Sequence, residues 1–122
     1  NGTTNVAGID GAGNIRSIAD VIAYSSSDAR LKDNITPITG ALDKVMSLGG
    51  YTFNWLPNQT TFEAGSSDVG VVAQEVEKVL PDIVETRANG YKAVKYDKRG
   101  PLLIEAIKEQ QAQIEELKAK VG

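Results

Sequence analysis

Residues 101–121, PLLIEAIKEQQAQIEELKAKV, carry the pattern that decides the fold of this chain. Within them, apolar or amide side chains recur at alternating spacings of four and three residues, at Leu103, Ile107, Gln110, Ile114, Leu117 and Val121. This alternation is typical of the seam of a coiled coil. Proline at position 101 suits the first turn of a helix, where its missing N–H is not needed. The sequence therefore predicts a long helix over 101–121 that associates with other chains through a narrow apolar stripe.

The sequence leaves two properties of this helix open. Its first two turns would also suit an amphipathic helix packed on its own domain, whereas the high polar fraction beyond about Gln110 favours a coiled coil. Glutamine at a seam position leaves the number of associated chains undecided. On the polar faces, Glu105 and Glu109 repel each other at i,i+4 spacing, whereas Glu116 and Lys120 attract.

The preceding part of the chain alternates short helices and strands. Helical spacing of apolar residues, aromatic–polar alternation and turn dipeptides provide the signals. In chain order they predict a helix from Asp33 or Thr36 to Gly49-Gly50, a strand over 51–55, an exposed loop over 57–68, a helix over 71–80, and a hairpin of residues 83–86 and 91–96 around Asn89-Gly90. The predicted class is α+β, a small helix and β-hairpin domain followed by a long C-terminal coiled-coil helix.

Residues 1–26 have a different character. They are rich in Gly, Asn and Thr, with Val6, Ile9, Ile15 and Ile18 as isolated apolar residues. A flexible linker is one interpretation. The preferred one is the last turn of a fibrous β-structured shaft, because flexible linkers contain few isoleucines and valines. We therefore divide the chain into a shaft, or passenger, segment over 1–26 and a domain over 27–122.

Composition argues against several classes of function. The chain has 122 residues, with 13 basic and 16 acidic side chains. It has no stripe of basic residues interleaved with aromatics, so the sequence does not indicate nucleic-acid binding. It contains no cysteine, and its carboxylates show no metal-ligand spacing. No stretch is long and apolar enough to span a membrane. We expect no cofactor, no metal, no nucleic acid and no membrane among its ligands.

Candidate chemistry lies in Ser27-Asp28-Ala29-Arg30-Leu31-Lys32, directly after two further serines. The chain has no histidine, so a lysine is the realistic base for a nucleophilic serine. A lysine acts as a base only when desolvation or a neighbouring cation favours its neutral form. Arg30 could supply that cation or bind an oxyanion, but a salt bridge to Asp28 or Asp33 fits equally well. Asp28 could cap a short turn through its carboxylate.

This hexapeptide, with Asn34-Ile35 behind it, resembles the start of the C-terminal intramolecular chaperone domain of phage tailspikes and tail fibres, a family also classed as self-cleaving serine peptidases. Two later blocks are similar to the family in the same order. They are Gly70–Val76 followed by Leu80-Pro81, and Tyr96-Asp97 leading into Pro101–Glu109. One departure is the polar connection 98–100, where the family has a hydrophobic position.

The resemblance implies a homotrimer that directs folding of the fibre segment preceding it in the same polypeptide. It implies cleavage between Ser26 and Ser27, with Ser27 as nucleophile, Lys32 as base, and supporting roles for Asp28, Arg30, Gly70 and Gln74. For Gln74, packing on the helix surface is the simpler interpretation. The six seam positions 103, 107, 110, 114, 117 and 121 would form the trimer interface. The resemblance further implies a phage tail precursor assembled in the bacterial cytoplasm, with this domain absent from the mature particle.

A second hypothesis keeps the trimer but not the chemistry. In it, the domain is a permanent, non-catalytic trimerisation cap of a fibre, and Ser27 and Lys32 are only structural. The 26 residues before the proposed bond are still present, which suits a precursor, a slow self-cleaving chain or two pieces held together.

Overall fold

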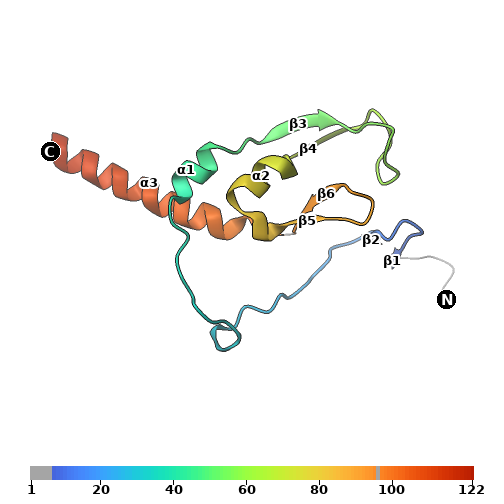
Figure 1. Cartoon of the computed structure of the whole chain (residues 1–122), viewed down its shortest axis with the longest axis horizontal. Coiled ribbons are helices and arrows are strands. Elements are labelled where there is room, and N and C mark those ends of the chain that lie inside the picture. Colours follow the sequence, from blue (N-terminus) through green and yellow to red (C-terminus); the bar gives the residue numbers. More distant parts are fainter. Residues whose placement is uncertain (1–6, 96) are drawn as a thin grey trace. The chain divides into compact units, whose positions relative to one another are not determined.

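The computed structural model describes residues 7–95 and 97–122 (Figure 1). These residues divide into two compact units. Among the described residues, unit 1 comprises 7–35 and 54–68, and unit 2 comprises 36–53, 69–95 and 97–122. Residues 1–6, where the predicted shaft segment begins, and Tyr96, at the end of the predicted hairpin, lie outside the described residues. The predicted α+β class is confirmed by short hairpins and one long C-terminal helix.

Unit 1 begins with a small antiparallel hairpin of β1 (Ala7–Ile9) and β2 (Ile15–Ser17), in which Ile9 pairs with Ile15. Asp10 organises the turn between them. Its carboxylate accepts hydrogen bonds from the backbone N–H of Ala12 and Asn14 and from Nε of Arg16 at 2.9 Å. These charge-assisted bonds hold the pKa of Asp10 well below its usual range, with the Arg16 side chain as the largest cause.

The apolar residues of this segment have no core to enter within the described part of unit 1. Ile9, Ile15 and Ile18 are between 74% and 77% exposed, and Val21 and Ile22 are similar. Residues 20–28 form no regular secondary structure. β1 and β2 are thus short extended pieces with exposed isoleucines. The assignment of residues 1–26 to a fibrous shaft stays a prediction.

The loop that follows the aromatic strand is more structured than its composition suggests. β3 (Tyr51–Asn54) pairs with β4 (Ser67–Gly70), so the predicted loop over 57–68 ends earlier than expected. In the loop between the strands, the rings of Trp55 and Phe62 stack, with their centroids 4.3 Å apart. β4 has little sequence signal, because the few residues of a short strand beside glycine and serine carry no clear alternation.

In unit 2, α1 (Ala41–Met46) begins later than predicted. Residues 36–40 precede it without helical structure, so the predicted start at Asp33 or Thr36 is wrong. Gly40 adopts a left-handed conformation with φ 62° at the helix N-cap, where glycine is tolerated without strain. The apolar spacing that indicated a longer helix includes Ile38, which reaches the core from the non-helical segment before α1.

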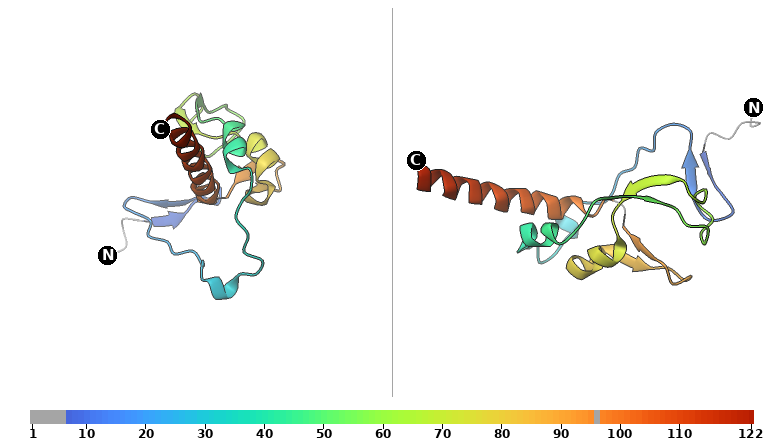
Figure 2. Two further views of the ribbon diagram at one scale, coloured as in Figure 1. Left: turned by 90° about the vertical axis from the view of Figure 1, so that its left-hand side faces the viewer. Right: turned by 90° about the horizontal axis from the view of Figure 1, so that it is seen from above.

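α2 (Ala73–Val79) and the hairpin of β5 (Val84–Thr86) and β6 (Lys92–Val94) confirm the predicted order of elements. α2 packs against the hairpin (Figure 2), and the side chain of Val76 is buried. The turn is longer than a two-residue hairpin turn. The Arg87 N–H donates to the Tyr91 carbonyl at 2.9 Å, and the turn lies between these two residues. Within the turn, Gly90 adopts a left-handed conformation with φ 86°.

The long helix α3 (Gly100–Val121) confirms the prediction over 101–121 and starts one residue earlier. Its first turns pack beside α1 (Figures 1 and 2), where Leu102 and Ala106 bury against Ala41. Glu109 extends this face, because its carboxylate accepts hydrogen bonds from the N–H of Ala41 at 2.7 Å and of Leu42 at 3.2 Å. The start of α3 therefore packs on its own domain, as the alternative interpretation of its first two turns allowed.

Candidate functional site

The two residues proposed for catalysis lie together in unit 1. Nζ of Lys32 is 2.9 Å from Oγ of Ser27 and donates a hydrogen bond to it. This distance is within the range over which a base can take a proton from a nucleophile. Spacing alone could not predict the contact, because five residues of extended chain would separate the two side chains. A turn must bring them together.

That turn is a short 3₁₀ helix, Ala29–Leu31, between Ser27 and Lys32. Asp28 caps it, because its carboxylate accepts a hydrogen bond from the Arg30 N–H at 2.8 Å, as the sequence suggested. The turn is closed by a backbone bond from the Lys32 N–H to the Ala29 carbonyl at 3.1 Å. Asp28 thus shapes the backbone that places Lys32 beside Ser27.

Arg30 pairs with Asp28. Its guanidinium donates to the Asp28 carboxylate at 2.7 Å and 3.1 Å, which makes the salt bridge its observed interaction. The Arg30 side chain holds the pKa of Asp28 below its usual range, and the Arg30 backbone N–H adds to this effect. Asp28 in turn raises the pKa of Arg30. In the single chain, Arg30 therefore stabilises the turn, and its participation in cleavage stays a prediction.

The Asp28–Arg30 pair predicts an acid-dependent loosening of this turn. Because the pKa of Asp28 is lowered on folding, its contribution is present above the unfolded value of about 3.9 and is lost as pH falls through the folded value. An NMR titration of the Asp28 carboxyl carbon should show a midpoint below that of unfolded aspartate. Arg30→Gln should move the midpoint upward, and an unchanged midpoint would show that the guanidinium is not the cause.

Ser27 and Lys32 are both exposed in the single chain. An exposed lysine is well solvated, whereas a lysine base must be neutral and therefore needs a desolvated site. The geometry for proton transfer is present, but the apolar surroundings that the chemistry requires are not formed by the described residues of unit 1. The site could act chemically only after additional protein surface covers it.

Gly70 and Gln74 belong to unit 2, whereas the serine–lysine pair belongs to unit 1. Gln74 is exposed on α2. A Cβ added at Gly70 would lie 3.6 Å from the Phe53 ring, which is ordinary van der Waals contact. No close backbone approach in the described residues therefore requires glycine at position 70, and the roles of both residues in cleavage stay predictions.

Two acidic residues to which the sequence analysis assigned no structural contact, Glu75 and Glu109, have structural roles. Glu75 accepts hydrogen bonds from the Gly49 N–H at 3.2 Å and from the Tyr51 hydroxyl at 2.7 Å, which raises the pKa of Tyr51. A Cβ on Gly49 would collide with the Tyr51 ring, so this junction needs glycine. The second residue is Glu109, which links α3 to α1. Neither role has a sequence signal, because both partners are distant in the chain.

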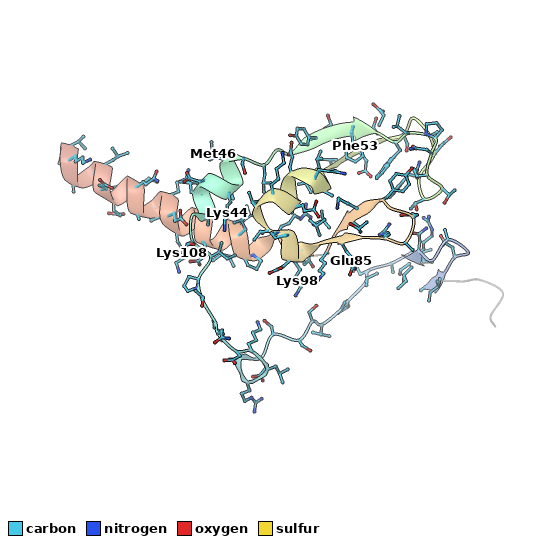
Figure 3. The ribbon with its side chains drawn as sticks, in the orientation of Figure 1. Lys44, Met46, Phe53, Glu85, Lys98 and Lys108 are labelled. Carbon is cyan, nitrogen blue, oxygen red and sulfur yellow. The ribbon has the colours of Figure 1, made fainter. Side chains whose placement is uncertain are left out.

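The proposed interface stripe of α3 is exposed. The exposed fractions of Leu103, Ile107, Ile114 and Leu117 are 49%, 65%, 41% and 61%, and Val121 is 87% exposed. Gln110 is exposed as well. No other described helix or strand of unit 2 lies beside the C-terminal half of α3 (Figure 3). The stripe therefore lies on a different side of the helix from Leu102 and Ala106, which face α1.

Among residues 7–95 and 97–122, no group of three or more acidic side chains is arranged to hold a metal ion. Within the same residues, no helix combines the length and the apolar character needed to cross a membrane.

A comparison with known families finds a match in the chain. Residues 27–85 match the family described as chaperone of endosialidase, and the match begins at Ser27. This segment of the chain is similar to that family. The resemblance noted in the sequence is thereby confirmed.

Similar proteins with curated descriptions are phage fibre proteins. The chain is 36% identical over 102 residues to the long tail fiber protein Gp37 of Enterobacteria phage T2. The matched segment covers 80% of this chain and 8% of that protein. The Gp37 protein of Enterobacteria phage K3 gives the same values, and that of Enterobacteria phage M1 is 35% identical over 99 residues, or 39% of its length. The chain therefore spans less than half the length of each of these relatives.

Proposed function

We propose that residues 27–122 form an intramolecular chaperone of a phage tail fibre. In this function, α3 associates three chains, the domain directs folding of the fibre segment that precedes it, and cleavage between Ser26 and Ser27 then releases it. The observation that carries the proposal is the 2.9 Å contact between Lys32 Nζ and Ser27 Oγ, at the residue where the family match begins. The similarity to long tail fiber proteins supports a location in a phage tail, with assembly in the bacterial host.

The cleavage step can be written from these two side chains. Ser27 Oγ attacks the carbonyl carbon of Ser26 while neutral Lys32 takes the hydroxyl proton. The Ser26–Ser27 C–N bond breaks, the Ser27 nitrogen gains a proton and leaves as an amine, and an ester joins Ser26 to Ser27 Oγ. Water then hydrolyses the ester, giving a Ser26 carboxylate and restoring the Ser27 hydroxyl. Each chain performs this reaction once.

In this proposal, association of the chains supplies the desolvated surroundings that Lys32 needs. Lys32 and Ser27 are exposed in one chain, so the neutral lysine requires cover from other chains or from the folded fibre. Cleavage would then follow assembly and report its completion. Local association through α3 also raises the effective concentration of the neighbouring fibre segments, which favours their register.

A permanent trimerisation cap is the second candidate. The exposure of both Ser27 and Lys32 favours it, because neither side chain is desolvated in the described residues. In that function the hydrogen bond between them would only stabilise the turn over 27–32.

The intact mass of freshly purified chain, measured under denaturing conditions beside Ser27→Ala, separates the two candidates. Self-cleavage gives a fragment of residues 27–122 in the wild type and an uncut variant. If the wild-type chain stays whole for days at neutral pH while its oligomer is formed, the cap is the correct function.

A further inference from the structure

Next to the exposed stripe of α3 lies an open apolar groove in unit 2. It has a volume of about 550 Å³ and lies where the end of α1 meets the first turn of α3. Its lining includes Val45, Leu48, Val71, Leu102, Leu103 and Arg99. Leu103 is also the first residue of the stripe, so groove and stripe form one continuous surface.

Ile104 is a large apolar residue of α3 that belongs neither to the exposed stripe nor to the face packed against α1. It is 59% exposed, it is not one of the six stripe positions, and it is not part of the core around Ala41. It lies two residues from both Leu102 and Ala106, which is about 200° around a helix. Ile104 therefore lies on the side of α3 opposite to α1 and cannot reach the groove of its own chain.

The heptad positions show where Ile104 would lie in a parallel assembly. With Ile107 and Ile114 at position a and Leu103 at position d, Ile104 occupies e and Arg99 occupies the preceding g. Across a parallel coiled coil, an e residue of one helix lies beside the preceding g residue of its neighbour. The neighbour's g residue here is Arg99, which lines the groove.

We propose that Ile104 of each chain inserts into the groove between α1 and α3 of the neighbouring copy. The inference rests on the proposed function, because it requires parallel association through α3. It adds a second contact outside the seam, and this contact joins the α1–α3 packing of one chain to the helix of the next. Three chains arranged around the seam would repeat the contact identically.

Cross-linking tests the contact directly, because the natural chain contains no cysteine. Full chains carrying either Ile104→Cys or Leu48→Cys are co-expressed and treated with a short thiol-specific cross-linker. We expect a covalent pair containing one chain of each variant. The matched control replaces Ile104→Cys with Ala112→Cys, at the outward position f of the same helix, and should give no such pair.

The outcomes distinguish this inference from the function on which it rests. If sedimentation shows an assembled oligomer but 104 and 48 cross-link no better than 112 and 48, the groove contact is wrong and the proposed trimer stands. If no oligomer forms, both fail.

A second pair of variants guards against a local effect of cysteine. Ile104→Ser should lower the thermal transition of the oligomer by several degrees relative to Ala112→Ser at the same concentration. Equal transitions of the two variants would overturn the contact.

Discussion

Replacing Lys32 with methionine should slow cleavage between Ser26 and Ser27 by about 10²- to 10⁴-fold, the usual contribution of a positioned base. Methionine keeps an unbranched chain of similar length but cannot accept the serine proton. Lys32→Arg should be equally slow, because a guanidinium stays protonated in proteins. The measurement is the time course of the 27–122 fragment by intact mass.

The control for charge is Lys98→Met, which removes a lysine outside the 27–32 turn (Figure 3). It should cleave at the wild-type rate. Equal cleavage rates of the wild type and Lys32→Met would show that Lys32 is not the base in this reaction.

Placing aspartate at both Ile107 and Ile114 should abolish association of the chains. Burying an isoleucine contributes about 1.5–3 kcal/mol, and each lost position is repeated in every chain of the assembly. The new carboxylates would also have to be desolvated without a partner, at several kcal/mol each. Sedimentation at micromolar concentration should therefore find single chains in place of the oligomer.

The fold of the single chain should tolerate these substitutions, because both isoleucines are more than 40% exposed in it. The matched control is Ala112→Asp with Ala119→Asp, which also places two aspartates seven residues apart on α3 but on its outward face. Alanine is the stronger helix former, so the control loses more helix propensity than the test variant, yet it should remain assembled. Similar dissociation of the two double variants would show that helix weakening, rather than the stripe, causes the effect.

The double variant of the stripe also tests how cleavage depends on assembly. If desolvation of Lys32 comes from other chains, the dissociated variant should remain uncut even though Ser27 and Lys32 are intact. Cleavage by the dissociated chain at the wild-type rate would mean that one chain completes the site by itself.

Helices and turns with local signals were predictable from the sequence. The heptad spacing and Pro101 predicted α3 almost to the residue, and Asn89-Gly90 predicted the β5–β6 hairpin. The N-terminal limit of α1 was wrong, because Ile38 joins the core from outside the helix and Gly40 delays the helical start. Apolar spacing reports which side chains are buried, and a non-helical residue beside a helix can share the same pattern.

For the candidate site, the sequence named residues but not their arrangement. The lack of histidine and the motif over 27–32 indicated Ser27 and Lys32, and the family match begins at the same serine. The 2.9 Å contact depends on a 3₁₀ turn capped by Asp28, and Arg30 supports that cap. Such a turn contains too few residues to produce a periodic signal.

The sequence by itself determined the identity of the long helix, its apolar stripe and the serine–lysine motif, because each depends on residues close together in the chain. Only the tertiary structure decided that Leu102 and Ala106 face α1 while Ile107 and Ile114 stay exposed, and that Glu109 binds the start of α1. The contacts between α1 and α3 join residues that are far apart in the chain. Their pairing is set by which surfaces can be buried together, and that is a property of the packed domain rather than of any local pattern.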